Sequence, residues 1–281
     1  MASAYAARVD LLDAVYTAVT LVVTDLDDDG FTRRTRTAAW DVRALLFHQL
    51  CDAQRALIVL TTDAPGPADT DRVSYWAAWS PGTPGADAHA RYATRAAAAY
   101  GRPTSLVQQW RDTASAAVRA ASNHAGQGFV TTQGHVLEVG DFAHTLVVEA
   151  VVHHLDLTLE VPSPPLPPEA YAAVVEVLTG LLDADLPAGW TGREAVLKGT
   201  GRDPLDAADR AAFGDRAARF PLFGLGQPRS RAKIRSREPW LISGRRASAR
   251  RGRRRAVVTR DTSTPPTAQP TSTRHAPTTL P

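Results

Sequence analysis

Apolar residues recur three and four positions apart along several segments of the chain, which is the spacing of one face of an α-helix. The stripe in residues 5–26 consists of Leu11, Leu12, Val15, Val19 and Val22, and that in residues 40–62 of Leu45, Leu46, Leu50, Leu57 and Leu60. The same reasoning predicts helices at 86–100, 104–124, 142–160 and 169–183. Segment 142–160 is apolar around nearly its whole circumference, which indicates a buried helix. We therefore expect an all-α protein.

Glycine and proline interrupt these helical segments. The stretch Pro65–Pro84 is predicted to be a long loop with one short helix. Gly101–Pro103 separates two helical pieces, and Thr104 or Ser105 would cap the second. Residues 126–142 break the helical period, so short extended segments are expected there.

The C-terminal part of the chain divides into two regions of different character. The proline-rich run at 161–169 ends a helix, because proline cannot continue one, and 161–226 is predicted to be a small lobe with one or two further short helices. Residues 227–281 hold 14 of the 32 basic and 2 of the 29 acidic side chains, so this segment carries +12 and residues 1–226 carry −9. With much Arg, Pro, Ser and Thr and little apolar periodicity, 227–281 is predicted to be a disordered basic tail.

Composition narrows the class of protein further. Apolar residues make up 44% of 281 residues, which is enough for a substantial core. The single cysteine, Cys51, excludes an internal disulfide and suits a reducing compartment. The first residues lack the basic region of a secretory signal, and the charge-free run Ala14–Thr24 is too short to span a bilayer. We expect a cytoplasmic protein that does not enter the membrane.

The segment 142–160 contains a carboxylate and an imidazole four residues apart. On a helix, Glu149 and His153 are separated by about 40° of rotation and roughly 6 Å of rise, so both leave the same face, whereas His154 points elsewhere. Asp156 lies on that face one turn on, where it could orient an imidazole. Glu149 and His153 could form an ordinary i,i+4 pair, or they could bind a metal.

A similar polar stripe runs along 40–62, where His48, Asp52 and Arg55 lie on one face. In one interpretation Asp52 pairs with Arg55 and His48 is a core histidine. In the other, His48 binds a metal, Asp52 supports it and Arg55 offers charge to an anionic substrate. Together with Glu149 and His153, His48 would make a three-ligand site with an open coordination position, as in catalytic zinc sites.

Several other catalytic motifs are missing from the sequence. The order Glu-x-x-x-His differs from the His-Glu-x-x-His of zincin proteases, and the paired Glu-x-x-His motifs of di-iron bundles do not occur. There is no Gly-x-Ser-x-Gly nucleophile elbow, phosphate loop or Gly-x-Gly-x-x-Gly motif. Cys51, three residues from His48, is expected to be a small hydrophobic residue rather than a nucleophile.

The segments "AAWDVRALLFHQLCDAQRAL" and "VVEAVVHHLDL" together resemble the N-terminal domain of mycothiol-dependent maleylpyruvate isomerases, within the DinB/YfiT-like superfamily. The resemblance covers residues 8–160 and implies an up-down four-helix bundle at 1–160. The family's tryptophan and ligand histidine fall on Trp40 and His48, and its Glu-x-x-x-His falls on Glu149 and His153, with Asp156 following. "GTGR" at 199–202 is similar to part of the family's larger C-terminal domain.

The resemblance implies a divalent metal, usually zinc, and a low-molecular-weight thiol, mycothiol in that family. The expected function is addition of the thiolate to an electrophilic small molecule, by an isomerase or S-transferase with His48, Glu149 and His153 as ligands. The alternative is a non-catalytic, metal-binding stress or regulatory protein of the same fold. Nucleic-acid binding through 227–281 is the least favoured reading, and a homodimer formed through exposed helix faces is left open.

Overall fold

The structure is a computed structural model that describes residues 2–77 and 84–223. These residues all belong to one compact unit, 1–241. The predicted tail at 227–281, with its predicted disorder, lies entirely outside the described residues. Within the described ranges the chain is mainly helical, which confirms the all-α class. None of the helices in these ranges is long and apolar enough to cross a membrane.

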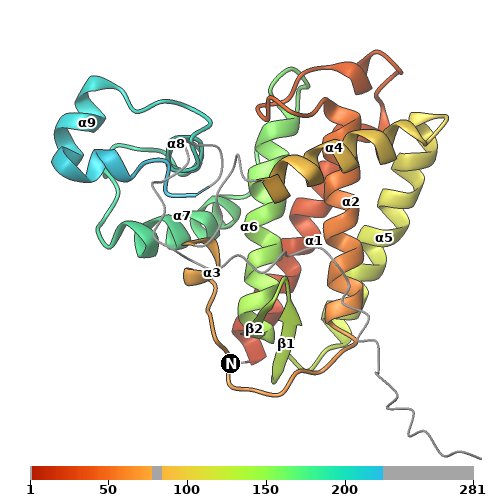
Figure 1. Ribbon diagram of the computed structural model, residues 1–281, viewed down its shortest axis with the longest axis horizontal. Helices are drawn as coiled ribbons and strands as arrows, with labels where there is room; N and C mark the ends of the chain where they lie inside the picture. The colour runs from red at the N-terminus through yellow and green to blue at the C-terminus, as the bar shows by residue number, and fades with distance from the viewer. Residues whose placement is uncertain (1, 78–83, 224–281) are drawn as a thin grey trace, which may run out of the picture. The chain divides into compact units, whose positions relative to one another are not determined.

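Four long helices of the described part pack side by side (Figure 1). They are α1 (Ala2–Thr24), α2 (Val42–Val59), α5 (Pro103–Asn123) and α6 (Val139–Leu157). Helix α1 contacts α5 and α6, and α2 contacts the same two helices from the other side. Their shared core includes the fully buried side chains of Leu12, Leu46, Trp110 and Leu146.

Contacts between the helices fix their directions. Tyr5 donates to the carbonyl of Ala121 and Trp110 donates to Thr20, so α1 and α5 are antiparallel. The pairs His48–Glu149 and Arg55–Phe142 likewise make α2 and α6 antiparallel. Arg8 near the start of α1 reaches Gly140 at the start of α6, so these two helices run the same way. The order is therefore up, down, down, up rather than a strict alternation, because residues 60–102 carry the chain back to the end where α2 began.

Local signals account for the helix ends. The carboxylate of Asp41 accepts a hydrogen bond from the amide of Ala44 at 2.8 Å and starts α2, so Trp40 precedes the helix that was predicted to begin with it. Helix α5 starts with Pro103 at its first turn and Arg102 in the cap position, so the prediction that Thr104 or Ser105 caps it is wrong.

A short β-hairpin lies between α5 and α6, within the segment where extended structure was expected. Strands β1 (Phe129–Thr132) and β2 (His135–Glu138) pair antiparallel, with Thr132 opposite His135. The two connecting residues, Gln133 and Gly134, both have positive φ, which matches the twist of a two-residue hairpin turn. The hairpin leads directly into α6.

The remaining described helices are short and lie beside the bundle. Helices α3 (Ser74–Ala77) and α4 (Pro84–Ala98) belong to the α2–α5 connection. In the described part of the predicted loop at 65–84, α3 is the short helix that was expected. The C-terminal lobe contains α7 (Pro168–Leu182), α8 (Gly192–Gly199) and α9 (Ala207–Phe213), followed by a 3₁₀ turn at Gly214–Arg219. Helices α7 and α8 both contact α6, which places the lobe against the helix that carries Glu149 and His153.

Candidate metal centre

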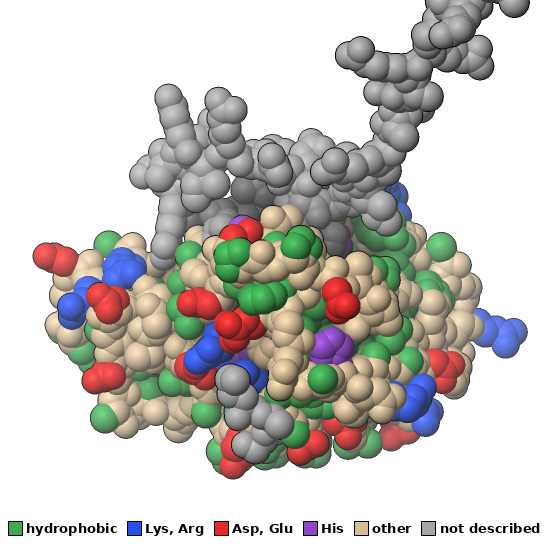
Figure 2. Space-filling model, turned by 90° about the horizontal axis from the view of Figure 1, so that it is seen from below, with side chains coloured by type: hydrophobic (Ala, Val, Ile, Leu, Met, Phe, Trp, Pro, Cys, Tyr) green, Lys and Arg blue, Asp and Glu red, His purple; other side chains and the backbone are tan. Residues whose placement is uncertain are grey.

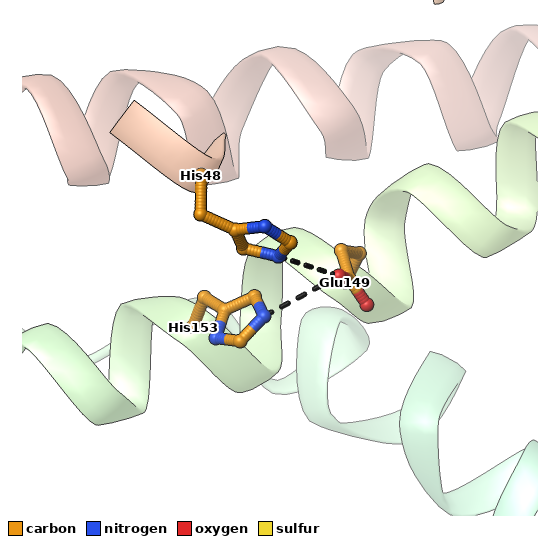
Figure 3. A group of neighbouring side chains, drawn as sticks. All are labelled: His48, Glu149 and His153. Carbon is orange, nitrogen blue, oxygen red and sulfur yellow. Dashed lines mark hydrogen bonds and ion pairs between the residues drawn. The ribbon is translucent and has the colours of Figure 1, made fainter. Parts of the chain in front are cut away.

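Two helices of the bundle bring the predicted metal ligands together. His48 lies in the middle of α2, and Glu149 and His153 lie one turn apart on α6 (Figure 3). Nε2 of His48 is 3.0 Å and Nε2 of His153 is 3.3 Å from Oε1 of Glu149. One ligand atom from each of the three residues lies within 4.8 Å of the other two. The fold thus brings together three residues that lie on two segments far apart in the sequence.

The outer nitrogen of each histidine faces a hydrogen-bond partner. Nδ1 of His153 lies 2.9 Å from Oδ2 of Asp156, and Nδ1 of His48 lies 2.9 Å from Nε2 of His89. An ionised carboxylate can only accept, so Nδ1 of His153 carries the hydrogen, and its Nε2 presents a lone pair when the ring is neutral. If Nδ1 of His48 likewise donates its hydrogen to His89, Nε2 of His48 also presents a lone pair. Two ring nitrogens and a carboxylate oxygen then converge, and such a set of acceptors needs a proton or a cation at its centre.

The pKa shifts of Glu149 and His153 agree with acceptor atoms that converge on a proton or a cation. Burial raises the pKa of Glu149, but the neighbouring His153 and His48 lower it more, to well below its usual range. Burial lowers the pKa of His153, whereas Glu149 and then Asp156 raise it more, to about 9. Without a metal, the cluster therefore keeps Glu149 ionised and a proton on His153. A divalent cation bound to the same atoms would displace that proton.

Two rings, those of Trp40 and His89, pack against the His48 ring. The indole of Trp40 stacks on the His48 ring with 4.7 Å between centroids and 26° between planes. Its Nε1 donates to the carbonyl of Ala90 on α4 at 3.2 Å, which fixes the indole in place. His89, from the same helix, stands edge-on to both rings. Burial lowers the pKa of His89 to about 4, with His48 as the next cause, so His89 is neutral near pH 7.

A buried ion pair lies behind His153. Asp156 has no exposed side-chain surface and Arg202 only 3%. Nε of Arg202 donates to Oδ1 of Asp156 and Nη2 donates to Oδ2, both at 2.7 Å. Burial raises the pKa of Asp156, but Arg202 and His153 lower it to about 2, so the carboxylate is ionised. The predicted position of Asp156 beside the imidazole is therefore observed, and Arg202 of the C-terminal lobe holds it there.

Asp52 and Arg55 continue the polar stripe of α2 away from His48. Nε of Arg55 donates to Oδ1 of Asp52 at 3.0 Å, and Nη1 donates to Oγ1 of Thr132 on the hairpin at 2.9 Å. The guanidinium also lies 5.5 Å from the ring centroid of Phe142. Of the two interpretations left open for this pair, the structure shows the one in which Asp52 and Arg55 bind each other; a contact of either with a ligand stays a prediction.

Cys51 lies next to this stripe but has the properties of a packing residue. It is partly buried against the apolar core. Burial and the charge of Asp52 raise the pKa of its thiol to about 11, so the thiol is protonated at neutral pH. This agrees with the expectation that Cys51 is not a nucleophile.

Two residues at the site were missed from the sequence. His89 on α4 lies beside the candidate ligand His48, 41 residues away in sequence, and Arg202, just after α8, lies beside Asp156, 46 residues away. No helical spacing relates them to the ligands. The sequence signal for Arg202 was the similarity of "GTGR" at 199–202 to part of the family's C-terminal domain. That similarity did not assign Arg202 to the metal site.

The bundle and its cluster together define the class of protein: an all-helical bundle with a candidate mononuclear metal centre of two histidines and one glutamate. The chain belongs to the family described as "Mycothiol maleylpyruvate isomerase N-terminal domain", which matches residues 12–158. This family membership confirms the resemblance and, with it, the expectation of an enzyme. The matched range holds all three candidate ligands but ends before the C-terminal lobe.

Two further comparisons add little to the family assignment. A solved structure, described as "Crystal structure of the mycothiol-dependent maleylpyruvate isomerase", aligns with 63% of this chain and 69% of its own. The identity is 15% and the TM-score 0.43. No curated protein matches the sequence.

Proposed function

We propose that this chain is a divalent-metal-dependent isomerase or S-transferase that uses a low-molecular-weight thiol. Its family indicates mycothiol as that thiol. One observation carries the metal part of the proposal: Nε2 of His48, Nε2 of His153 and Oε1 of Glu149 converge, while the outer nitrogens of both rings are hydrogen-bonded elsewhere. Neutral imidazoles oriented in this way are typical of histidines that bind a metal.

The residues present fit a catalytic site rather than a structural one. His48, Glu149 and His153 supply three ligands, which suits zinc and leaves a coordination position for a small molecule, whereas structural zinc sites use four protein ligands. When bound, such a metal lowers the pKa of a coordinating thiol, so that a thiolate is present at neutral pH. The side chain of Glu149 is 21% exposed, compared with 11% and 8% for the histidines, so Glu149 is the ligand with the largest exposed fraction.

The surrounding side chains hold the site in position. His89 and Asp156 orient the two rings, and Trp40 covers one face of His48 and excludes water there. Arg55 lies on the same face of α2 as His48, in an ion pair with Asp52, and we propose that its guanidinium donates hydrogen bonds to an anionic substrate.

Addition of the thiolate to an activated cis alkene forms a C–S bond and moves the π electrons onto the adjacent carbonyl as an enolate. Rotation about the former double bond and loss of the thiolate then give the trans alkene. No electron or proton is gained or lost overall. If the electrophile carries a leaving group that departs with its electron pair, the thiolate remains attached and the outcome is S-transfer.

The test is turnover by the intact chain. Metal-reconstituted protein is mixed with mycothiol and maleylpyruvate, or with alkylating electrophiles, and product is followed by chromatography beside Glu149→Gln. We expect turnover that needs both metal and thiol and is lost in Glu149→Gln. Metal binding with no turnover on any electrophile would contradict the proposal and favour the non-catalytic metal-binding alternative. In that case chelation would still lower the melting temperature.

A further inference from the structure

The three candidate metal ligands lie on bundle helices, but His153 contacts Asp156, and Asp156 contacts Arg202 of the C-terminal lobe. Oδ2 of Asp156 is shared: it faces Nδ1 of His153 at 2.9 Å and accepts from Nη2 of Arg202 at 2.7 Å. Nε of Arg202 holds the other oxygen, so the guanidinium and the carboxylate meet through two parallel hydrogen bonds. This two-point geometry fixes the plane of the carboxylate as well as its position.

The burial of this pair makes the arrangement sensitive to Arg202. Asp156 and Arg202 have 0% and 3% exposed side-chain surface, and a buried carboxylate is stable only when it is paired. Without the guanidinium, the two hydrogen bonds that fix the carboxylate plane would be lost, and Asp156 would turn away from His153. Nδ1 of His153 would then lose the acceptor that orients the ring, and Nε2 would no longer be held toward Glu149.

The lobe in turn fixes Arg202. Its amide donates to the carbonyl of Leu197 on α8 at 2.8 Å, and Nη1 donates to the carbonyl of Thr200 at 3.3 Å. The preceding residue, Gly201, has φ +75°, a conformation that suits glycine and turns the chain back after α8. The end of α8 therefore aims the guanidinium at α6.

We infer that Arg202 is a positioning residue of the metal site, through which the C-terminal lobe sets the orientation of His153. Arg202 acts through Asp156 and contacts neither the metal nor the substrate. The inference rests on the metal site proposed above. It extends that site beyond residues 12–158, the range that matches the family, because the lobe contributes a residue on which the site depends.

The test measures metal affinity rather than turnover. The dissociation constants of the full chain for Zn²⁺ and Co²⁺ are determined by competition with a chromogenic chelator, and the visible spectrum of the Co²⁺ form reports ligand geometry. Arg202→Met should weaken binding by up to about 10- to 100-fold, the loss expected when a metal-binding histidine such as His153 loses its outer partner, here Asp156. Arg202→Lys keeps the charge but loses the two-point contact, so it should fall between wild type and Arg202→Met.

A second arginine of the lobe provides the matched control. Arg219 donates to the carbonyls of Leu181 and Leu182 on α7, so Arg219→Met disturbs the lobe without touching Asp156. It should keep the wild-type metal affinity and Co²⁺ spectrum. If Arg202→Met unfolds because it leaves Asp156 unpaired, Asp156→Asn/Arg202→Met removes both charges. This double variant should fold and bind metal no more weakly than Asp156→Asn alone, because both residues act in one chain of contacts.

The outcomes separate the two proposals. Wild-type affinity and an unchanged Co²⁺ spectrum in folded Arg202→Met would overturn the role of Arg202 and leave the metal site intact. A wild-type protein that binds neither ion would overturn both. Equal losses in Arg202→Met and Arg219→Met would show that general damage to the lobe is the cause, which also contradicts the inference.

Discussion

Replacing His89 by alanine tests whether the ring behind His48 contributes to metal binding. In the structure the two rings share one hydrogen bond, with 2.9 Å between Nδ1 of His48 and Nε2 of His89. Loss of such an outer partner lowers metal affinity about 10- to 100-fold, which corresponds to about 1.4–2.7 kcal/mol. The metal-free protein should lose less, about 1 kcal/mol of unfolding free energy, because one partly buried hydrogen bond contributes little to net stability.

The assay is isothermal titration of Zn²⁺ into the metal-free protein, beside thermal unfolding of the same sample. His135→Ala is the control, because the His135 ring likewise has a hydrogen-bond partner, Asp69 at 3.3 Å, but its side chain is 40% exposed on the hairpin. His89→Ala should bind zinc more weakly and His135→Ala should not. Equal affinities in His89→Ala and wild type would refute the idea that His89 sets the orientation of His48.

Further predictions concern residues around the site. Asp52→Asn should lower the free energy of unfolding by about 3 kcal/mol, because it leaves the Arg55 charge largely buried and unpaired. Asp52→Asn/Arg55→Met should recover part of that loss, and urea unfolding of both variants measures it. Cys51→Ser should leave metal content and turnover unchanged; loss of turnover with metal retained would show that the thiol takes part. Burial lowers the pKa of His144 from its ordinary value of 6.5. Below about pH 6.5 the unfolded chain therefore binds a proton that the native state excludes, so stability falls toward acid pH, and His144→Gln should show a shallower fall; an identical slope would contradict this assignment.

The parts of the site that could be predicted from the sequence are those fixed by local geometry. Four residues along a helix return a side chain to nearly the same face, so Glu149, His153 and the neighbouring Asp156 were identified from one segment. The long bundle helices followed from apolar spacing, with ends that differ by a few residues because caps such as Asp41 decide where a helix starts. The family resemblance added His48, which spacing alone left open.

The contacts that the sequence did not reveal are all between distant elements. His89 approaches His48 because α4 crosses α2, and Arg202 approaches Asp156 because the end of α8 faces α6. Neither residue has a local partner in the sequence that marks it. The parallel course of α2 and α5 was also hidden, because it depends on the path of residues 60–102 and not on the pattern within either helix.

The central claim is that His48, Glu149 and His153 bind one divalent metal, and metal content tests it most directly. The intact chain is purified without an affinity His-tag or added metal and analysed by plasma mass spectrometry, beside His48→Ala/His153→Ala. We expect close to one equivalent of zinc or a similar divalent ion per chain in the wild type and its loss in the variant. A wild-type chain without stoichiometric metal, even after zinc is supplied to the metal-free protein, would contradict the account.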